Sequence, residues 1–171
     1  MGARKLYRRS DVVGRTLSAW RTRAVLPHVS GRLMDLACGD NRVVRAFGSG
    51  VGVDIVEYQN VDVVCRDFTQ LPFRDDEFDT VTILAALNYF DDPVSVLREV
   101  RRSLKRDGTL LITFLNKNVS RLWHRFRERD ITPRPAFDEA ELCACLAAAD
   151  LRVVDTRSFM FGLNIIYFVK R

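Results

Sequence analysis

Leu33-Met34-Asp35-Leu36-Ala37-Cys38-Gly39-Asp40-Asn41 is the stretch that decides the fold of this chain. Apolar residues surround one acid, a bend of small residues follows, and residues 42–47 have helical spacing. The pattern predicts a buried strand, a tight turn and the start of a helix. Small residues let a ligand approach the backbone, and N–H groups at a helix start bind polar or anionic groups. An ordinary strand, turn and helix without a ligand has the same pattern.

Composition points to one domain. The 171 residues are 47% hydrophobic and 29% charged, which is enough for one hydrophobic core and too little for two domains. No apolar run reaches the length of a membrane span, and the N-terminus lacks the apolar stretch of a signal peptide. The four cysteines form no C-x-x-C pair and only two histidines are present, so we expect reduced thiols, no metal site and a cytoplasmic protein.

Positive charge is concentrated near the N-terminus. Residues 1–32 hold eight basic residues and one acid, a net charge of +7, so the rest of the chain carries −2 of the total of +5. A basic arm of this kind can bind RNA, DNA or anionic lipid, and it can equally be a solvated surface.

Strands and helices alternate along the chain after a basic tail at 1–9 and a helix at 10–27. Strands are predicted at 32–37, 51–55, 61–65, 78–84, 109–115, 151–158 and 163–169. Helices are predicted from Asn41 to Gly48, from Asp91 or Asp92 to the Asp107-Gly108 pair, and from a capping box at Asp138 and Glu141. This alternation predicts an α/β fold, a doubly wound and mainly parallel seven-stranded sheet. Only residues 160–162 separate the last two strands, so the last strand should enter antiparallel, as a hairpin.

The segment 117–130 is amphipathic, with Val119, Leu122, Trp123 and Phe126 on one side and arginines around the rest. One interpretation is a lid that packs over a ligand cleft. The other is docking to a membrane surface or to an anionic, lipid-linked substrate.

Four motifs follow one another within residues 31–115. They are Asp35 to Asn41, Gly52-Val53-Asp54-Ile55, the run Asp67 to Phe73 continued by Asp75 and Phe78-Asp79, and Leu97 to Gly108. They resemble D-x-G-C-G-x-G, G-x-D-x, D-x-x-x-L-P-F-x-D-x-x-F-D and the helix and turn before the fifth strand of the class I S-adenosylmethionine-dependent methyltransferases, in particular the small type 11 branch. Each motif alone is weak, but the four in this order are specific. The resemblance implies a Rossmann-like methyltransferase fold with 31–115 as the cofactor-binding half and 116–171 as the substrate-side and C-terminal half.

The resemblance also implies S-adenosyl-L-methionine as cofactor. The residues it assigns to the cofactor are Asp35, Ala37, Cys38, Gly39, Asn41, Asp54, Ile55, Asp67, Phe68 and Leu84. The turn 35–41 would hold the methionine part, and Leu84 and Ala85 would pass along its end. Asp54 would accept hydrogen bonds from the ribose hydroxyls, and Asp67 would bind the adenine amino group with Phe68 beside the ring. The structural alternatives are a loop-capping Asp54 and a merely exposed Asp67.

The sequence departs from the family pattern at two single residues and one pair. Ala37 replaces the first motif glycine, which is a minor change if the backbone there is not at positive φ. Asn41 replaces the last one, and asparagine both tolerates the left-handed region and caps helices. Asn88-Tyr89 stands where many relatives carry Glu-His, so the histidine that sometimes assists catalysis is absent.

The acceptor side is less well defined. The substrate-binding candidates are Asn88, Tyr89, Trp123 and His124, and no catalytic base is assigned, because Tyr89 also suits a pocket wall and His124 a surface position. Leu84-Ala85-Ala86-Leu87 lacks the N-P-P-Y pattern of base methylation, which favours a small-molecule, sugar or lipid-linked acceptor over nucleic acid. Peripheral membrane contact and the oligomeric state stay open.

Three rival functions remain. A non-catalytic S-adenosylmethionine-binding regulator or partner protein would tolerate the altered turn. An RNA-modifying methyltransferase would use the basic arm. A nicotinamide dehydrogenase would need G-x-G-x-x-G, and the turn has only one glycine.

Overall fold

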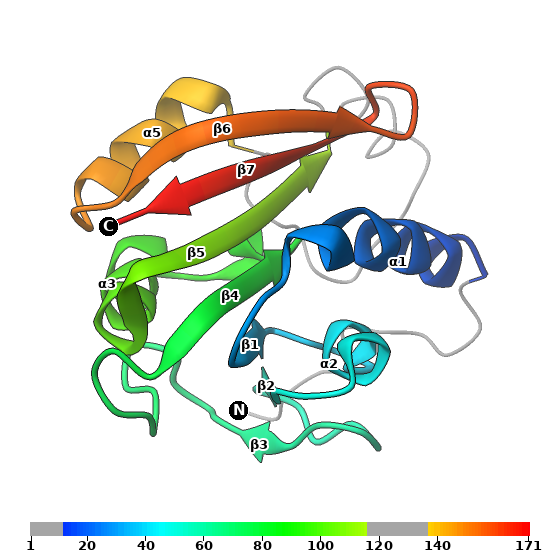
Figure 1. Ribbon diagram of the computed structural model, residues 1–171, viewed down its shortest axis with the longest axis horizontal. Helices are drawn as coiled ribbons and strands as arrows, with labels where there is room; N and C mark the ends of the chain where they lie inside the picture. The colour runs from blue at the N-terminus through cyan, green and yellow to red at the C-terminus, as the bar shows by residue number, and fades with distance from the viewer. Residues whose placement is uncertain (1–11, 116–136) are drawn as a thin grey trace.

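The described residues form a seven-stranded sheet, drawn as a ribbon in Figure 1. This computed structural model describes residues 12–115 and 137–171. The strand order is β3-β2-β1-β4-β5-β7-β6. The bounds are β1 Leu33–Leu36, β2 Val51–Asp54, β3 Val63–Val64, β4 Phe78–Leu84, β5 Leu104–Leu115, β6 Arg152–Phe159 and β7 Asn164–Lys170.

The strand directions confirm the predicted topology. β1 pairs in parallel with β2 and β4, and β3 and β5 extend the sheet in the same sense. β7 is antiparallel to both of its neighbours, β5 and β6. The winding reverses between β1 and β4, so the carboxyl ends of the parallel strands form the edge at which such sheets bind ligands. We call this edge the site edge.

Helices cover both faces of the sheet (Figure 1). The helix α1 (Val12–Val25), continued by the 3-10 helix η1 (Leu26–His28), packs with α2 (Arg42–Phe47) on one face. The helices α3 (Pro93–Ser103) and α5 (Glu139–Ala147) pack on the other. The predicted N-terminal helix and the capping box at Asp138 and Glu141 are confirmed. Within the described ranges, no helix is long and apolar enough to cross a membrane.

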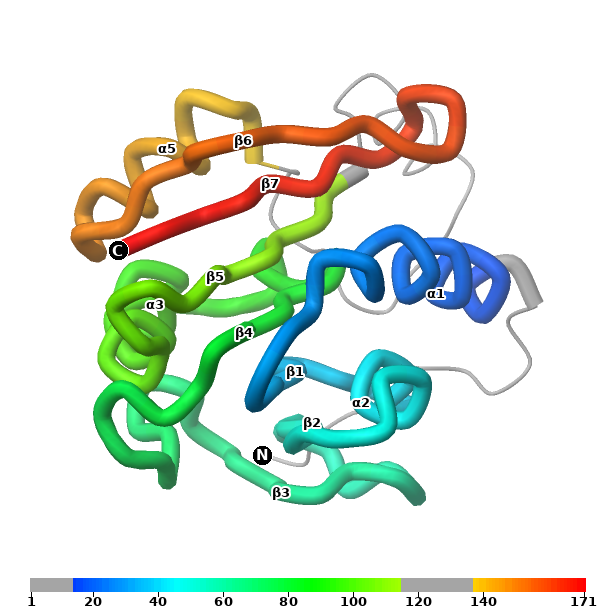
Figure 2. Tube along the Cα trace, viewed as in Figure 1, coloured from blue at the N-terminus to red at the C-terminus, as the bar shows by residue number. Residues whose placement is uncertain are grey.

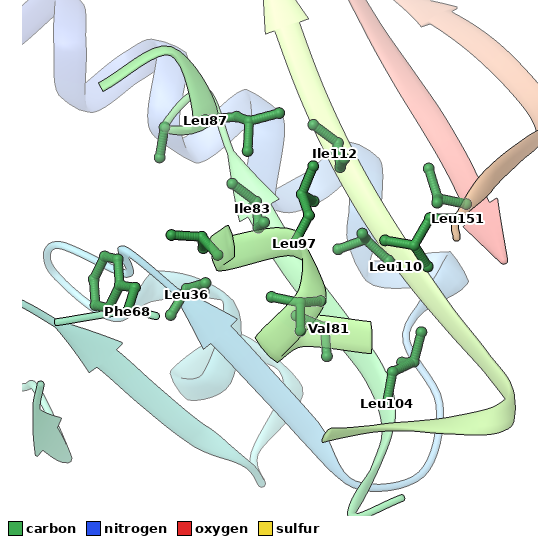
Figure 3. Close-up of a cluster of buried hydrophobic side chains, with 14 of the residues drawn as sticks. Leu36, Phe68, Val81, Ile83, Leu87, Leu97, Leu104, Leu110, Ile112 and Leu151 are labelled. Atoms are coloured by element: carbon green, nitrogen blue, oxygen red, sulfur yellow. The ribbon is translucent and has the colours of Figure 1, made fainter. Parts of the chain in front are cut away.

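Two clusters of buried side chains hold the layers together. The larger lies between the sheet and α3 and α5, and Figure 3 shows part of it. The smaller joins Val25 and Val43 of α1 and α2 to the opposite face of the sheet. Successive residues of β5 serve the two sides in turn, since Leu110 and Ile112 belong to the first cluster and Leu111 to the second. Such a strand is apolar on both faces because both are covered.

The junction of α3 and β5 differs from the prediction. The helix ends at Ser103 rather than at Asp107-Gly108, and β5 begins at Leu104, which pairs with Phe78. Residues 105–108 leave the regular register with β4. Gly108 allows this, because a Cβ there would lie 2.7 Å from Leu104 Cδ1. The prediction was wrong because an Asp-Gly pair suits a helix end and a bulge equally well.

The β3 strand is also shorter than the predicted 61–65. Only Val63 and Val64 pair with β2, although the Cys65 N–H still donates to the Asp54 carbonyl at 2.9 Å. On the other side of the strand, the Asp62 carboxylate turns toward β2 and accepts the Gly52 N–H at 2.7 Å. The Asp62 N–H also donates to the Gly52 carbonyl at 3.0 Å, so backbone bonds to β2 continue on both sides of the two paired residues.

Candidate cofactor and substrate site

The turn between β1 and α2 is tightly wound. Ala37, Gly39 and Asn41 have φ values of 59°, 55° and 55°, all in the left-handed region. A Cβ built on Gly39 would meet no atom within 4 Å, so the space beside this residue is open. The turn therefore offers its backbone to a ligand, as its small residues predict.

Ala37 is strained in this turn. The left-handed region brings the Cβ of an L-residue close to its own backbone, at a cost of roughly 1–2 kcal/mol. Because Ala37 has a φ of 59°, replacing the family glycine here is not the minor change that a negative φ would have allowed.

Asn41 fastens the turn from the side of β2. Its side chain is 1% exposed, and its Nδ2 donates to the Asn60 carbonyl at 2.7 Å and to Asp62 Oδ2 at 2.8 Å. A Cβ on Gly52 would lie 2.2 Å from Asn41 Oδ1, so the asparagine fills the space that this glycine leaves. Asn41 occupies the N-cap position of α2, as predicted, but its side chain makes no capping bond to the helix. The predicted tolerance of positive φ is confirmed.

Asp54 lies at the end of β2 and fixes two loops. Its Oδ2 accepts the Gly39 N–H at 2.8 Å and its Oδ1 accepts the Val56 N–H at 3.0 Å. Asp54 therefore has the loop-capping role that was the structural alternative. A carboxylate has about four acceptor sites, so both oxygens keep capacity for ligand hydroxyls. Ile55, the next residue, is exposed.

Buried acids give the turn a negative environment. Asp35 on β1 is buried, and the Thr82 hydroxyl of β4 donates to its Oδ1 at 2.6 Å. Burial raises the pKa of Asp35 to about 7, with the Asp54 charge adding to the rise and the Thr82 bond opposing it. Burial also raises the pKa of the Cys38 thiol, and the charges of neighbouring aspartates raise it further. Burial thus disfavours charge at both groups, and the neighbouring aspartate charges add a negative potential that further disfavours a thiolate.

Asp67 and Phe68 follow β3. Thr69 donates both its hydroxyl, at 2.6 Å, and its N–H, at 2.9 Å, to Asp67 Oδ1, and these bonds hold the pKa of Asp67 below its usual value. Asp67 Oδ2 has no hydrogen-bond partner among the described residues, and the residue is exposed. Phe68 is buried and packs edge to face on Phe90, with ring centroids 5.4 Å apart.

Arg102 holds the loop that follows, and the sequence interpretation missed it. Its guanidinium donates to the Phe73 and Leu71 carbonyls at 2.8 and 3.2 Å and pairs with Glu99 and Asp75 at 2.8 and 2.7 Å. The i, i+3 spacing of Glu99 and Arg102 on α3 could have suggested an ion pair. No pattern in the sequence indicates the bonds to a loop about 30 residues earlier.

The acceptor side lies at the end of β4. Leu84 is half-buried, and Ala85 has a φ of 52° and donates its N–H to the Thr113 carbonyl at 3.0 Å. Asn88 and Tyr89 lie in the 3-10 helix η2 (Leu87–Tyr89) and are half-buried. The candidates Trp123 and His124, with the whole segment 117–130, lie outside the described residues.

These features fit S-adenosylmethionine, whose sulfonium and ammonium groups give it a net positive charge. The negative potential at the turn attracts such a cation. The open space beside Gly39 admits a ligand, and oxygens of Asp54 and Asp67 can still accept hydrogen bonds. In the part of the chain that the structure describes, no group of three or more His, Cys, Asp or Glu could hold a metal ion.

The sheet order and the turn after β1 define a Rossmann-like fold of the class I methyltransferase type. Solved structures agree. A SAM-dependent methyltransferase from Thermotoga maritima has a TM-score of 0.74 at 21% identity, over 94% of this chain and 92% of that one. A SAM-dependent methyltransferase from Aquifex aeolicus has a TM-score of 0.67 at 19% identity, over 91% of this chain and 92% of that one. At these identities the likeness concerns the fold.

The sequence match points the same way. Residues 34–112 match the methyltransferase domain family of type 11, which supports a class I methyltransferase of this branch. S-adenosylmethionine is the cofactor that this class of domain implies.

Curated relatives bear names in the same class. The demethylmenaquinone methyltransferase of Clavibacter sepedonicus is 35% identical over 112 residues, 54% of this chain and 46% of the relative. The demethylmenaquinone methyltransferase of Thermotoga maritima is 31% identical over 131 residues, which are 63% of this chain and 57% of that relative. The ubiquinone/menaquinone biosynthesis C-methyltransferase UbiE of Pseudomonas putida is 29% identical over 139 residues, which are 72% of this chain and 53% of that relative. The chain thus spans about half the length of these relatives.

Proposed function

We propose that this protein transfers the methyl group of S-adenosylmethionine to a small-molecule or lipid-linked acceptor. The observation that supports this most is the turn at 37–41, which Asp54 fastens and buried acids surround, within a methyltransferase domain. Asp54 would bind the ribose hydroxyls through its remaining lone pairs. Asp67 would bind the adenine amino group through Oδ2, with Phe68 as the wall behind it.

The chemistry needs little from side chains. Bound S-adenosylmethionine would supply a methyl group whose C–S bond breaks as the acceptor atom attacks, the electron pair staying on sulfur and the acceptor releasing a proton to solvent. The residues of the chain hold the reactants in line and exclude water. Leu84 and Ala85 would line the path between the cofactor and the acceptor. The residues that would contact the acceptor are Asn88, Tyr89, Trp123 and His124. We assign none of them as a base.

The names of the relatives favour one acceptor class. Demethylmenaquinone methyltransferases and a ubiquinone/menaquinone C-methyltransferase support a quinone-type acceptor with a lipid chain, methylated on carbon. The apolar run from Leu84 to Leu87 suits such an acceptor better than a nucleic-acid base.

Calorimetric titration of the purified protein tests the proposal. S-adenosylmethionine and S-adenosylhomocysteine should bind in the micromolar range, and NAD should not. Asp54→Ala and Asp67→Ala should weaken binding at least tenfold, whereas Asp107→Ala, a carboxylate far from the turn, should not. Because Asp54 also fixes two loops, circular dichroism must show that each variant is folded. A folded wild-type protein without affinity for either sulfur ligand would contradict the proposal.

A second candidate is a cofactor-binding protein without turnover. The strained Ala37 and the Asn88-Tyr89 pair in place of Glu-His favour it. Incubation with methyl-labelled cofactor and separate lipid and RNA extracts of cells separates the two candidates. Label in the lipid extract supports the enzyme, label in RNA supports the modifying alternative, and binding without label in either supports the non-catalytic protein.

A further inference from the structure

The hairpin between β6 and β7 ends in an apolar tip. Phe161 is fully exposed there, and Leu163 is 38% exposed. Met160 and Phe161 have φ values of 54° and 56°, a conformation that turns normally give to glycine, asparagine or aspartate. A phenylalanine that contributes nothing to the core and strains its own backbone gives the fold no benefit.

This tip lies at the site edge. Asn164, which follows the tip, pairs with Leu115, the last residue of β5. Figure 2 shows the hairpin loop beyond the end of β5, on the side toward which β4 and β5 run. Whatever the tip touches therefore also faces the carboxyl ends of the strands that carry the cofactor turn.

The helix α1 adds a second exposed aromatic side chain. Trp20 is 50% exposed. Its neighbour Arg21 donates from Nε to Asn164 Oδ1 at 3.3 Å, so α1 is joined to the base of the hairpin. The helix that carries Trp20 is thus joined to the hairpin that carries the apolar tip, and we call α1 and this tip the rim.

The α1 part of this rim is positively charged. The helix carries Arg15, Arg21 and Arg23 and no acidic residue, and Arg15 and Arg23 are exposed. Exposed Trp and Phe beside arginines are typical of surfaces that lie in the headgroup layer of an anionic bilayer, where rings enter the interface and cations meet lipid phosphates. A stable protein interface would bury roughly 800 Å² per partner, whereas the exposed large apolar side chains of α1 and the tip, among the described residues, are Trp20, Phe161 and Leu163.

We propose that Phe161, Leu163 and Trp20 dock this protein peripherally on an anionic lipid bilayer, with Arg15 and Arg23 against the lipid phosphates. The site edge then faces the membrane surface, from which a lipid-linked molecule could be reached without leaving the bilayer. The docking is independent of the proposed methyl transfer, since it needs neither cofactor nor turnover.

Co-sedimentation of the full chain with vesicles, without cofactor, tests the docking. Vesicles of phosphatidylcholine with about 30% phosphatidylglycerol should bind the protein, vesicles of phosphatidylcholine alone should bind it weakly, and salt should reduce binding. Phe161→Ser should lower the partition coefficient about tenfold, as expected for one aromatic ring lost from the interface. Trp20→Gln should lower it similarly, and Arg15→Gln with Arg23→Gln should remove the preference for anionic lipid.

Val154→Ser is the matched control, because Val154 is 50% exposed on β6 away from the tip. It should bind vesicles like the wild type, and all variants should keep the wild-type melting temperature. If Phe161→Ser and Trp20→Gln bind vesicles as strongly as the wild type, the affinity belongs to the basic tail and the proposal is overturned. A Phe161→Ser variant that changes the oligomeric state in the absence of lipid would also overturn it, because the tip would then dock on a second copy.

Discussion

Asn41 and Gly52 can only be understood together. The family pattern has a glycine at the end of the turn, and here an asparagine side chain enters the space above β2. Gly52 leaves that space open, and Asp62 receives both the Asn41 amide and the Gly52 N–H. The substitution therefore adds a bond network to the turn rather than simply removing a glycine.

Gly52→Ala tests this pairing. The new Cβ would lie 2.2 Å from Asn41 Oδ1, so the asparagine must move and the free energy of unfolding should fall by about 2 kcal/mol. In an Asn41→Gly background the same change should have little effect, because the space is then free. Urea unfolding of the four proteins of this double-mutant cycle measures the coupling. Equal losses in both backgrounds would show that Asn41 does not fill the space.

Ala37→Gly should stabilise the protein by about 1 kcal/mol, because relief of a left-handed alanine exceeds the entropy that glycine adds to the unfolded chain. We expect this gain because Ala37 has a φ of 59°, in the left-handed region. The control is Ala46→Gly in α2, where φ is helical, and it should destabilise by about 1 kcal/mol. Opposite signs in urea unfolding support the strain, and a loss at both positions contradicts it.

The raised pKa of Asp35 gives stability a pH dependence. The folded protein holds this proton up to a pKa of about 7, whereas the unfolded chain releases it near its ordinary value of 3.8. The folded state therefore binds more protons between these values, and stability falls as the pH rises toward 7. Asp35→Asn lacks this proton equilibrium. The free energy of unfolding of the wild type, measured in urea, should fall relative to that of the variant by roughly 3 kcal/mol from pH 5 to pH 8. A constant difference would place an ordinary pKa on Asp35.

At the scale of elements, local signals were predictable and distant ones were not. The capping box of α5 lies within four consecutive residues, and its two bonds are confirmed at 2.8 Å each. The strand ending in Asp54 was predictable from its hydrophobic pattern. The bonds of Asp62 and Arg102 join residues that only the folded sheet brings together, so no spacing in the sequence reveals them.

Arg102→Ala tests the loop clamp at this scale. It removes charge-assisted bonds to two carbonyls and two carboxylates, so the loop 71–75 should lose its support and stability should fall by about 2 kcal/mol. Affinity for S-adenosylmethionine should fall with it, since Asp67 lies four residues before this loop. Arg101→Ala, on the same helix with one exposed bond to the Asp150 carbonyl, should change little. Equal losses for the two variants would assign the effect to the helix instead.

At the scale of the whole molecule, the alternation of elements was enough to predict the topology. Parallel strands need long crossovers and a hairpin needs only a few residues, so the loop lengths restrict the sheet to very few arrangements. The bulge at 105–108 was not predicted, because contacts with residues distant in the sequence stabilise it. Lys105 pairs with Asp79 at 2.8 Å, and Lys170 donates to the Asp107 carbonyl at 2.7 Å.

The place of β7 has a consequence for biosynthesis. β7 is made after β6 but lies between β5 and β6 in the sheet. While the ribosome is still extending the chain through residue 163, β6 has no partner and the edge of β5 has no cover. Leu110 and Ile112 then belong to a strand whose backbone invites pairing with another nascent chain. Closure of this part of the sheet must wait for β7, and a pause in translation before it would prolong the interval in which the edge of β5 is exposed.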